Sequence, residues 1–389
     1  MPDSVEEGGA GVNRAVPFRQ FVVKVNSRCN LACRYCYMYF AADQGWRRQP
    51  RSASPAMLRQ TARRIGEHAA AHGLGAVSVV LHGGEPLLTA PRVLGAFVRE
   101  VRARVPSGCA VYASLQTNGT LLTAAGLREL AGHGIRIGLS LDGGLAAHNT
   151  QRVDHAGRPA WPRVLRAARL LSEPEHRTAY AGVLCVVDVA SDPVAVYESL
   201  VALRPPAVDF LLPYGNWTSP PPGLPAPPEA PTPYGDWLCA VFERWWHADH
   251  RRAAVRLFEE CIAALLGLPV AGEVFGLQPF TAVVVETNGD IELVDALKTA
   301  YPGATATGLN VFRSAFDEAL GHPGVVARQA GREALADDCR SCPVVDVCGG
   351  GHYAHRYRAG SGFRNPAVYC ADLQRVIRHV AGALHEVAR

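Results

Sequence analysis

Three cysteines lie within the short polar stretch "SRCNLACRYC", residues 27–36, and are the residues of this chain best suited to metal chemistry. Cys29, Cys33 and Cys36 have the spacing C-x3-C-x2-C. Four thiolates close a structural zinc site or saturate a 4Fe–4S cluster, so three thiolates leave one metal position open. An open position is what a reacting cofactor needs. The alternatives are a partial zinc site and buried thiols without a metal.

A second group of cysteines near the C-terminus is complete. Its spacing is C-x2-C-x5-C followed by a distant fourth cysteine, and four thiolates would fill every protein position of a metal site. Spacing alone leaves zinc and an iron–sulfur cluster both open. The members of this group are Cys339, Cys342, Cys348 and Cys370. The scattered cysteines, which we expect to be core thiols, are Cys109, Cys185, Cys239 and Cys261.

The three-cysteine loop follows the first of a series of segments that have the pattern of strands. Helical patterns separate these segments, and the alternation predicts parallel βαβ units in an α/β sheet or partial barrel. The predicted strands are residues 21–25, 76–82, 110–117, 135–142, 181–188 and 208–213. The predicted helices are residues 56–72, 91–104, 123–132, 160–172 and 193–203.

Polar motifs follow each of the first four predicted strands. After the cysteine loop these are "HGGEP" (82–86), "QTNGT" (116–120) and "SLDGG" (140–144). Chemistry in parallel α/β sheets and barrels gathers at the carboxyl ends of the strands. Motifs on a shared rim therefore predict one active site.

The rest of the chain has a different character. A Pro-rich stretch at 213–237 cannot continue a sheet or a helix and is predicted to be an extended or irregular loop. A helical, Trp-rich stretch at 234–268 follows, whose aromatic residues favour a core position over a peptide groove. Asn288-Gly289 then predicts a hairpin turn. The expected division is a tail (1–17), a barrel (18–213), a linker and bridging helical region (214–280) and a C-terminal domain (281–389).

Composition narrows the class of protein. The net charge is +4 and no dense basic block with aromatic residues occurs, so we expect no nucleic-acid partner. The acidic, Gly-rich N-terminus is unlike a signal peptide, and no run of eighteen apolar residues predicts a membrane span. We therefore expect a cytoplasmic protein without a membrane partner, in which the 11 cysteines stay reduced and are available for metals.

The C-x3-C-x2-C loop, with an aromatic residue before its last cysteine, resembles the radical S-adenosylmethionine (radical SAM) superfamily. The resemblance implies a 4Fe–4S cluster on the three cysteines, whose open iron binds the methionine end of S-adenosylmethionine and generates a 5′-deoxyadenosyl radical. "HGGEP" matches the methionine-binding motif of that family. The cofactor-binding residues implied by the resemblance are Tyr35, Gly83, Gly84, Glu85, Gln116, Asn118, Ser140, Asp142 and Arg152.

The C-terminal cysteines resemble the SPASM domain, a cluster-bearing extension of peptide-modifying radical SAM enzymes. The resemblance implies a TIM-like partial (β/α)6 barrel followed by a SPASM-type domain, and an auxiliary 4Fe–4S cluster on the four cysteines. The full SPASM pattern has seven cysteines and two auxiliary clusters. Here His352 and Val294 stand where further cysteines are expected, so we expect only one auxiliary cluster. His352 without neighbouring thiolates makes a poor substitute ligand.

Asp295 matches an aspartate that serves as the catalytic base in sulfatase-maturating relatives. Without that resemblance, Asp295 could equally be a surface residue at the end of a hairpin strand. Together the motifs look most like maturases that crosslink a ribosomally made peptide by joining an aromatic ring to a β-carbon (cyclophane formation). Asp295 would then take a proton, and the auxiliary cluster would take an electron.

Two alternatives remain. The same core serves oxidation of Ser or Cys to formylglycine, or formation of a thioether. A zinc-stabilised peptide-binding protein without catalysis is an alternative from another class, against which the methionine-binding motif argues. The expected partners are a precursor peptide and an external electron donor such as flavodoxin or ferredoxin. A purely structural auxiliary cluster is the competing interpretation of the C-terminal site.

Overall fold

The strand and helix alternation predicted for residues 20–213 is present in the computed structural model, which describes residues 15–224, 231–387 and 389. The strands of this region are β1 (Gln20–Asn26), β2 (Ala76–Gly83), β3 (Ala110–Thr117), β4 (Ile135–Ser140), β5 (Tyr180–Val186) and β6 (Ala207–Leu211). The longer helices between them are α2 (Pro55–Ala71), α3 (Pro91–Arg104), α4 (Ala124–Gly132), α5 (Trp161–Ser172) and α6 (Pro193–Val201).

Local sequence explains where these elements begin and which face they bury. The Ser54 side chain accepts a hydrogen bond from the Met57 amide at 3.1 Å, and Pro55 occupies the first turn of α2. Buried residues of α2 recur at helical spacing, as in Leu58, Ala62 and Ile65. Strand β2 alternates strictly between half-buried and buried residues. Both α2 and β2 therefore bury one face in the core.

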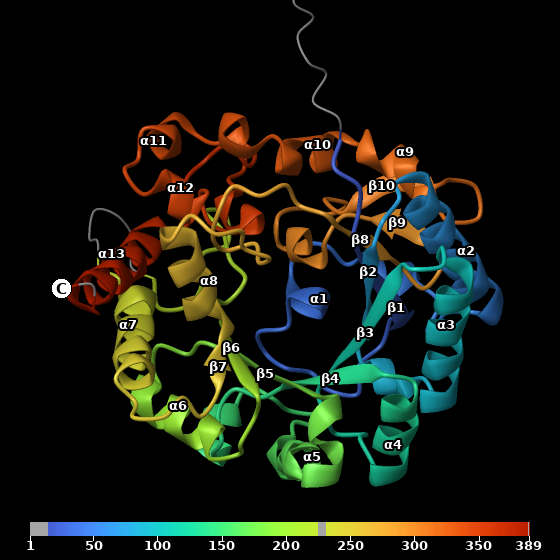
Figure 1. Ribbon diagram of the computed structural model, residues 1–389, viewed down its shortest axis with the longest axis horizontal. Coiled ribbons are helices and arrows are strands. Elements are labelled where there is room, and N and C mark those ends of the chain that lie inside the picture. The colour runs from blue at the N-terminus through green and yellow to red at the C-terminus, as the bar shows by residue number, and fades with distance from the viewer. Residues whose placement is uncertain (1–14, 225–230, 388) are drawn as a thin grey trace, which may run out of the picture.

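All strands of the described residues belong to one sheet, in the order β10-β9-β8-β1-β2-β3-β4-β5-β6-β7. Neighbours from β1 to β7 are parallel, as the alternation predicted. Figure 1 shows the strands curving around a centre near the short helix α1 (Tyr37–Phe40), with helices α2 to α6 outside them. The predicted α/β partial barrel is confirmed.

The hairpin predicted at Asn288-Gly289 is present but belongs to the same sheet. Strand β8 (Ala282–Val285) pairs in parallel with β1, and β9 (Asp290–Glu292) and β10 (Ala306–Asn310) extend the sheet in antiparallel fashion. Gly289 has φ +90°, a conformation that favours glycine and that the turn requires. The expected boundary at 281 thus adjoins a strand that completes the barrel sheet, and the domain limits stay a prediction.

The single helical stretch predicted at 234–268 is wrong in one respect. Two helices, α7 (Pro233–Trp246) and α8 (Arg256–Leu265), are separated by the short strand β7 (Ala254–Val255). The polar run at 247–252 has no apolar period with which to continue a helix, and β7 joins the sheet edge beside β6. Trp237 and Trp245 are buried, so the core interpretation of these aromatic residues is confirmed.

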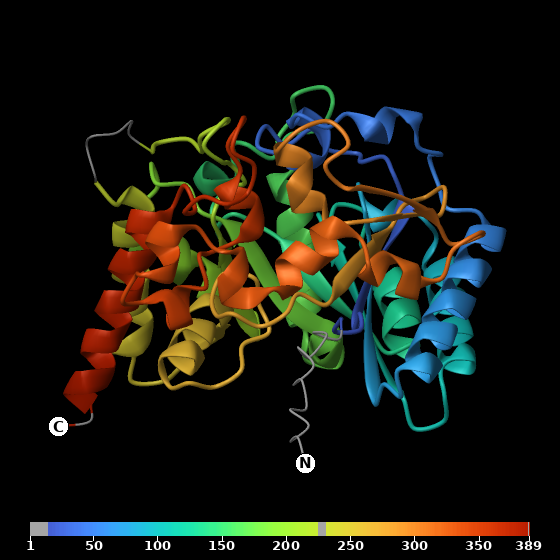
Figure 2. The same cartoon turned by 90° about the horizontal axis from the view of Figure 1, so that it is seen from above.

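The C-terminal segment contains short helices and ends in a long one. Figure 2 shows its orange and red residues lying across one side of the strands, with α13 at the edge of the molecule. The described part of the Pro-rich stretch packs against this segment, since the Trp217 indole donates to the Pro366 carbonyl at 2.7 Å. Residues 1–14 of the expected tail and 225–230 of the linker lie outside the described residues. The helices of the segment are α9 (Phe316–Leu320), α10 (Pro323–Gln329), α11 (Asp337–Arg340), α12 (Val345–Cys348) and α13 (Cys370–Val387).

Among the described residues, no helix combines the length and the apolar character that crossing a membrane requires. Of the scattered cysteines, Cys185, Cys239 and Cys261 are buried, as expected of core thiols, and Cys109 is half-buried.

Candidate active site

The three-cysteine loop lies between β1 and α1 and is fixed by backbone hydrogen bonds to the segment after β4. The Ala32 amide donates to the Val153 carbonyl at 2.7 Å, and the Arg34 amide donates to the Gln151 carbonyl at 3.0 Å. The Cys29 sulfur accepts a hydrogen bond from the Leu31 backbone amide at 3.4 Å and another from the Asn118 side-chain amide at 3.6 Å. The loop is thus held in place by the protein backbone, which leaves the three sulfur atoms to bind a metal.

The chemistry of the three thiols fits a cationic metal centre. Burial raises the pKa of Cys29 to about 12 and that of Cys36 to about 11. Cys33 and Cys36 are close enough to Cys29 to raise its pKa further when they carry charge. Three thiols in these surroundings become thiolates together only when a cation compensates them. The residues therefore fit the cluster that the resemblance implies.

The glycines of "HGGEP" adjoin the cysteine loop. The Gly84 amide donates to the Asn26 carbonyl at 2.8 Å. A Cβ on Gly83 would lie 2.0 Å from the same carbonyl oxygen, and one on Gly84 would lie 1.9 Å from the Tyr39 hydroxyl. Both glycines therefore allow the motif to pack closely against the segment that carries the cysteines. Their role in binding methionine stays a prediction.

Glu85 is fully buried and its carboxylate is occupied by protein donors. One oxygen accepts from the Leu87 amide at 2.9 Å and from the Thr117 hydroxyl at 2.6 Å, and the other accepts from the Asn118 amide at 2.9 Å. Burial raises its pKa, and these hydrogen bonds oppose the rise. Glu85 joins the ends of β2 and β3 in the described conformation. Its direct contact with the methionine ammonium stays a prediction.

The predicted residues after β3 and β4 are brought together in two small networks. The Gln116 amide donates to the Ser140 hydroxyl at 2.8 Å, and the Asn118 amide donates to the Cys29 sulfur at 3.6 Å. Asn118 thus connects "QTNGT" directly to the cysteine loop. The predicted roles of these residues toward a ribose or a carboxylate stay predictions.

Tyr35, Asp142 and Arg152 form the second network. The Tyr35 hydroxyl donates to Asp142 at 2.5 Å and accepts from the Arg152 guanidinium, which also lies 3.6 Å from Asp142. The Nε atom of Arg152 is buried without a hydrogen-bond partner. The Arg152 charge acts on Cys33 and lowers its pKa against the effect of burial. A buried cation with an unused donor beside the cysteine loop suits an anionic ligand at this site.

Asp295 does not lie on the surface; it is buried within a network of charges. Its carboxylate lies 2.5 Å from the Lys24 ammonium and 3.7 Å from that of Lys298. Lys24 also contacts Glu286 at 2.6 Å, and Lys298 lies 3.3 Å from Glu292. Burial raises the pKa of Asp295, but the two ammonium groups outweigh burial and hold that pKa below its ordinary value. Asp295 is therefore an ionised carboxylate.

Sequence reasoning missed the lysines and glutamates of this network. The available signal was Lys24 itself, a charged residue in the middle of the apolar strand "FVVKV". Its partners arise more than 250 positions later in the chain, so no local pattern identifies them. The network occupies the hairpin region where Val294 replaces an expected cysteine.

The four C-terminal cysteines line a common cavity of about 210 Å³. Cys339 lies on α11, Cys348 ends α12 and Cys370 begins α13, with Cys342 after α11. The cavity also has apolar walls, and burial raises the pKa of Cys348 to about 11. Four thiols around one cavity, two of them buried and two half-buried, fit a closed metal centre of the predicted kind.

The glycines after Cys348 explain how the chain turns away from this cavity. Gly349, Gly350 and Gly351 all have positive φ values, from +58° to +80°. The Arg356 guanidinium donates to the carbonyls of all three. His352 then leaves the cavity and lies 3.3 Å from Glu273. It is not placed as a substitute ligand for the four-cysteine centre.

Comparisons with known proteins agree with this geometry. Residues 23–180 match the model of the radical SAM superfamily. The chain is 28% identical over 351 residues to a serine-type anaerobic sulfatase-maturating enzyme of Klebsiella aerogenes, covering 89% of this chain and 82% of the relative. It is 29% identical over 171 residues to a cysteine-type anaerobic sulfatase-maturating enzyme of Clostridium perfringens, covering 44% of each.

Solved structures share the fold. The structure of native anSMEcpe with bound AdoMet superposes with a TM-score of 0.78 at 22% identity, covering 95% of this chain and 99% of the other. Streptococcus suis SuiB bound to precursor peptide SuiA gives a TM-score of 0.60 at 16% identity, covering 92% and 76%. The cysteine loop and the "HGGEP" motif both lie within residues 23–180, the part of the chain that matches the radical SAM superfamily.

Proposed function

We propose that this enzyme oxidises a side chain of a peptide substrate, and that conversion of a serine or cysteine to formylglycine is the first candidate reaction. The sulfatase-maturating relatives, which align with 89% of this chain, support the proposal. The observation that carries it is Asp295, a buried and ionised carboxylate whose 3₁₀ helix packs against α1, the helix that follows the three-cysteine loop. A base beside a radical-generating site suits a substrate that must lose a proton after it loses a hydrogen atom.

The atoms and electrons that leave the substrate indicate a role for Asp295. Oxidation of a serine –CH₂OH group to an aldehyde removes one hydrogen atom from carbon, one proton from the hydroxyl and one electron. When bound, the SAM-binding cluster and S-adenosylmethionine supply a deoxyadenosyl radical that takes the hydrogen atom, and the auxiliary cluster supplies an electron acceptor. The Asp295 carboxylate accepts the proton. Its pKa lies below the ordinary value, so it is in the accepting form at neutral pH.

The cofactors find their ligands in the two cysteine groups. Cys29, Cys33 and Cys36 would hold the SAM-binding cluster, with Arg152 and Asn118 beside it. The four-cysteine cavity would hold the auxiliary cluster. An external donor such as flavodoxin or ferredoxin would reduce the first cluster, and this partner stays a prediction.

Crosslinking of a precursor peptide through an aromatic ring and a β-carbon is the second candidate. The observation that favours it is the charge network at the hairpin, where Lys24, Glu286 and Lys298 surround Asp295 and no thiolates remain for a further cluster. This chain therefore departs from the full SPASM pattern of seven cysteines and two auxiliary clusters. Cyclophane formation needs the same base, since restoring aromaticity also releases one proton and one electron.

Product analysis separates the candidates. The reconstituted enzyme is incubated anaerobically with reductant, S-adenosylmethionine and peptides that contain either a central serine or an aromatic residue near an aliphatic one. Formylglycine formation gives loss of two hydrogen atoms from the serine peptide and a product that reacts with a hydrazide probe. Crosslinking gives the same loss of mass, no reaction with hydrazide and an internal segment that resists fragmentation.

Either product retains the proposal that the enzyme oxidises a peptide side chain. Deoxyadenosine formation without any change in peptide mass, across serine, cysteine and aromatic substrates, would remove it. A colourless protein that contains zinc and cleaves no S-adenosylmethionine would support the non-catalytic alternative instead.

A further inference from the structure

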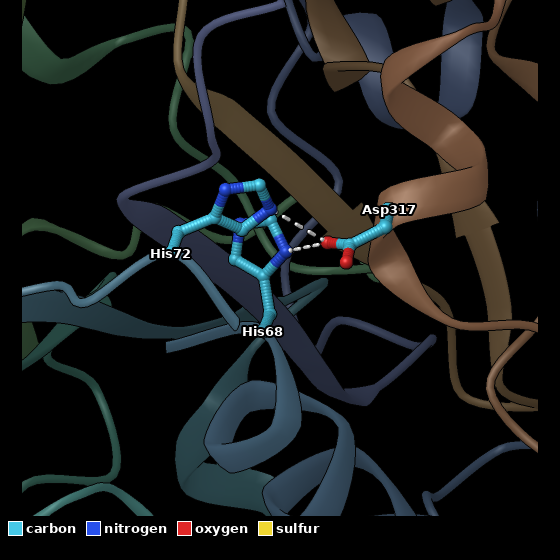
Figure 3. Close-up of side chains that lie close together, drawn as sticks. All are labelled: His68, His72 and Asp317. Carbon is cyan, nitrogen blue, oxygen red and sulfur yellow. Dashed lines mark hydrogen bonds and ion pairs between the residues drawn. The ribbon is translucent and has the colours of Figure 1, made fainter. Parts of the chain in front are cut away.

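Two histidines and one aspartate converge on the outside of the barrel, at the junction of α2 and α9. His68 and His72 lie one turn apart at the end of α2, and Asp317 lies in α9. Figure 3 shows both imidazole rings pointing at the same carboxylate. The Nε2 atom of His72 lies 3.1 Å from Oδ1 of Asp317, and the Nδ1 atom of His68 contacts the same oxygen. Neither the clusters nor the proposed reaction uses these residues.

The hydrogen bonds of His68 leave a mismatch at this carboxylate. Its Nε2 atom lies 3.2 Å from the Phe18 carbonyl oxygen, which only accepts, so this nitrogen carries the hydrogen. In a neutral imidazole the Nδ1 atom then bears a lone pair, and this lone pair faces the Asp317 carboxylate. Two acceptors in contact require a cation between them, which is either a proton on His68 or a metal ion.

The surroundings of His68 disfavour the proton. The ring packs against Phe18, Phe21 and Phe316, with ring centroids 5.8 to 6.2 Å apart. The His68 side chain is only 1% exposed, and a charged imidazolium that loses its hydration in such apolar surroundings is costly. A neutral imidazole whose distal N–H is fixed by a backbone carbonyl is the state in which histidine binds metals, and such an outer hydrogen bond commonly orients a ligand ring.

We propose that His68, His72 and Asp317 bind one divalent transition-metal ion, with zinc as the ion that their two nitrogens and one oxygen suit best. Ligand atoms of a tetrahedral zinc site lie roughly 3.3 Å apart, as follows from bond lengths near 2.0–2.1 Å. The separation between His72 and Asp317 is already close to this value. The Asp317 side chain is 44% exposed, so it can turn to admit the ion, and solvent can provide the fourth ligand.

The site would connect parts of the chain that are distant in sequence. Asp317 lies 249 positions after His68, so a bound ion would link α2 of the barrel to α9 of the C-terminal segment. The expected effect of zinc is therefore on the stability of this junction and not on S-adenosylmethionine cleavage.

The test measures zinc in the holoenzyme with its iron–sulfur clusters in place. Wild-type protein and the variants His72→Ala and Asp317→Asn are treated with EDTA and dialysed anaerobically against buffered micromolar free Zn²⁺; zinc and iron are then counted by mass spectrometry. These two residues are chosen because their side chains are partly exposed, so folding is retained. His247→Ala is the matched control, because His247 also stands at the end of a helix beside a carboxylate, Glu243, but lies outside the proposed site.

We expect one zinc ion in the wild type and in His247→Ala, its loss from both site variants, and the same iron content throughout. Added zinc should also raise the thermal midpoint of the wild type and leave that of His72→Ala unchanged. A wild type without zinc, or with zinc that the two variants retain, would overturn the proposal. The first of these outcomes would leave a protonated His68 as the cation at Asp317.

Discussion

The two cysteine groups differ chiefly in the number of thiols that they offer, three in the loop after β1 and four in the C-terminal cavity. The three-cysteine loop lies at the carboxyl ends of the strands, beside the Asn118 amide and the buried Arg152 guanidinium. The four-cysteine cavity has apolar walls that include Val345 and Leu373, but polar groups also reach its thiols. The Gln374 amide donates to the Cys370 sulfur at 3.4 Å, and the Arg356 charge lowers the pKa of Cys348 against the effect of burial. A site short of one protein ligand suits a cosubstrate, whereas a site with four thiolates suits a group that keeps its coordination. This contrast implies a division between radical generation and electron transfer.

The largest effect is expected from removal of the three-cysteine loop. Replacing Cys29, Cys33 and Cys36 with Ala should abolish deoxyadenosine formation and leave about four iron atoms per chain, those of the closed site. Anaerobic reconstitution followed by iron analysis and chromatography of deoxyadenosine checks this. Eight iron atoms in the variant would show that the loop does not hold a cluster.

The reciprocal change should have the opposite signature. Replacing the four C-terminal cysteines with Ala should leave S-adenosylmethionine cleavage measurable and reduce peptide product to background, because the electron acceptor is lost. The variant should also unfold at a lower temperature, since bound metal contributes to folding. Unchanged product yield together with a lower melting temperature would assign the cluster a structural role only. The variants of this set are Cys339→Ala, Cys342→Ala, Cys348→Ala and Cys370→Ala.

Asp295→Asn separates proton transfer from radical formation. We expect deoxyadenosine to form at a rate close to that of the wild type, while peptide product falls about 10²- to 10⁴-fold, the usual contribution of a positioned base. The ratio of product to deoxyadenosine, measured in one reaction mixture, is the readout. A ratio equal to that of the wild type would exclude Asp295 as the base.

Lys24→Met should give a smaller effect that depends on pH. Lys24 and Lys298 hold the pKa of Asp295 below its ordinary value, against the effect of burial. Without Lys24 that pKa rises, so the carboxylate becomes protonated and product formation is lost at the acidic end of the pH profile first. His82, Tyr37 and Tyr214 also face this region.

The control for Lys24→Met is the double variant with Asp295→Asn, in which the shift of the pH profile should disappear. Breaking a buried ion pair costs about 3–5 kcal/mol of folding free energy, so the melting temperature should also fall. A lower melting temperature with an unchanged pH profile would mean that Lys24 only stabilises the fold. The same linkage predicts that the stability contributed by ionised Asp295 is present at neutral pH and is lost as the pH falls through its depressed pKa.

The elements of the barrel were predictable because their signals are local. The strict alternation in β2 and the cap of α2 at Ser54 lie within a few residues of the structure they specify. The cysteine ligands were equally accessible, since their spacing is itself the signal. The prediction of one helix across 234–268 was wrong because the residues on both sides have helical patterns, and the short polar run between α7 and α8 was not recognised as a break.

The remaining features depend on contacts between distant residues. The charge network joins Lys24 to Asp295, and each partner alone looks like an isolated charged residue. The glycines of "HGGEP" look like a ligand-binding turn, and only the structure places Asn26 and Tyr39 against them. The junction of His68 and Asp317 likewise has no local signature. In each of these cases the surroundings of a residue depend on which distant residues pack against it, and no single segment of the sequence contains that information.

The parallel pairing of β1 with β8 has a consequence for the order of folding. During synthesis the residues of β1 are made first, but the partner on one of its edges, Ala282–Val285, is made only after most of the chain. Until then that edge exposes unpaired backbone groups, which are a template for association with other chains. A fragment that ends at residue 213 would retain every superfamily motif and still lack this strand. We expect such a fragment to aggregate, so that the smallest stable form of the enzyme extends through the hairpin.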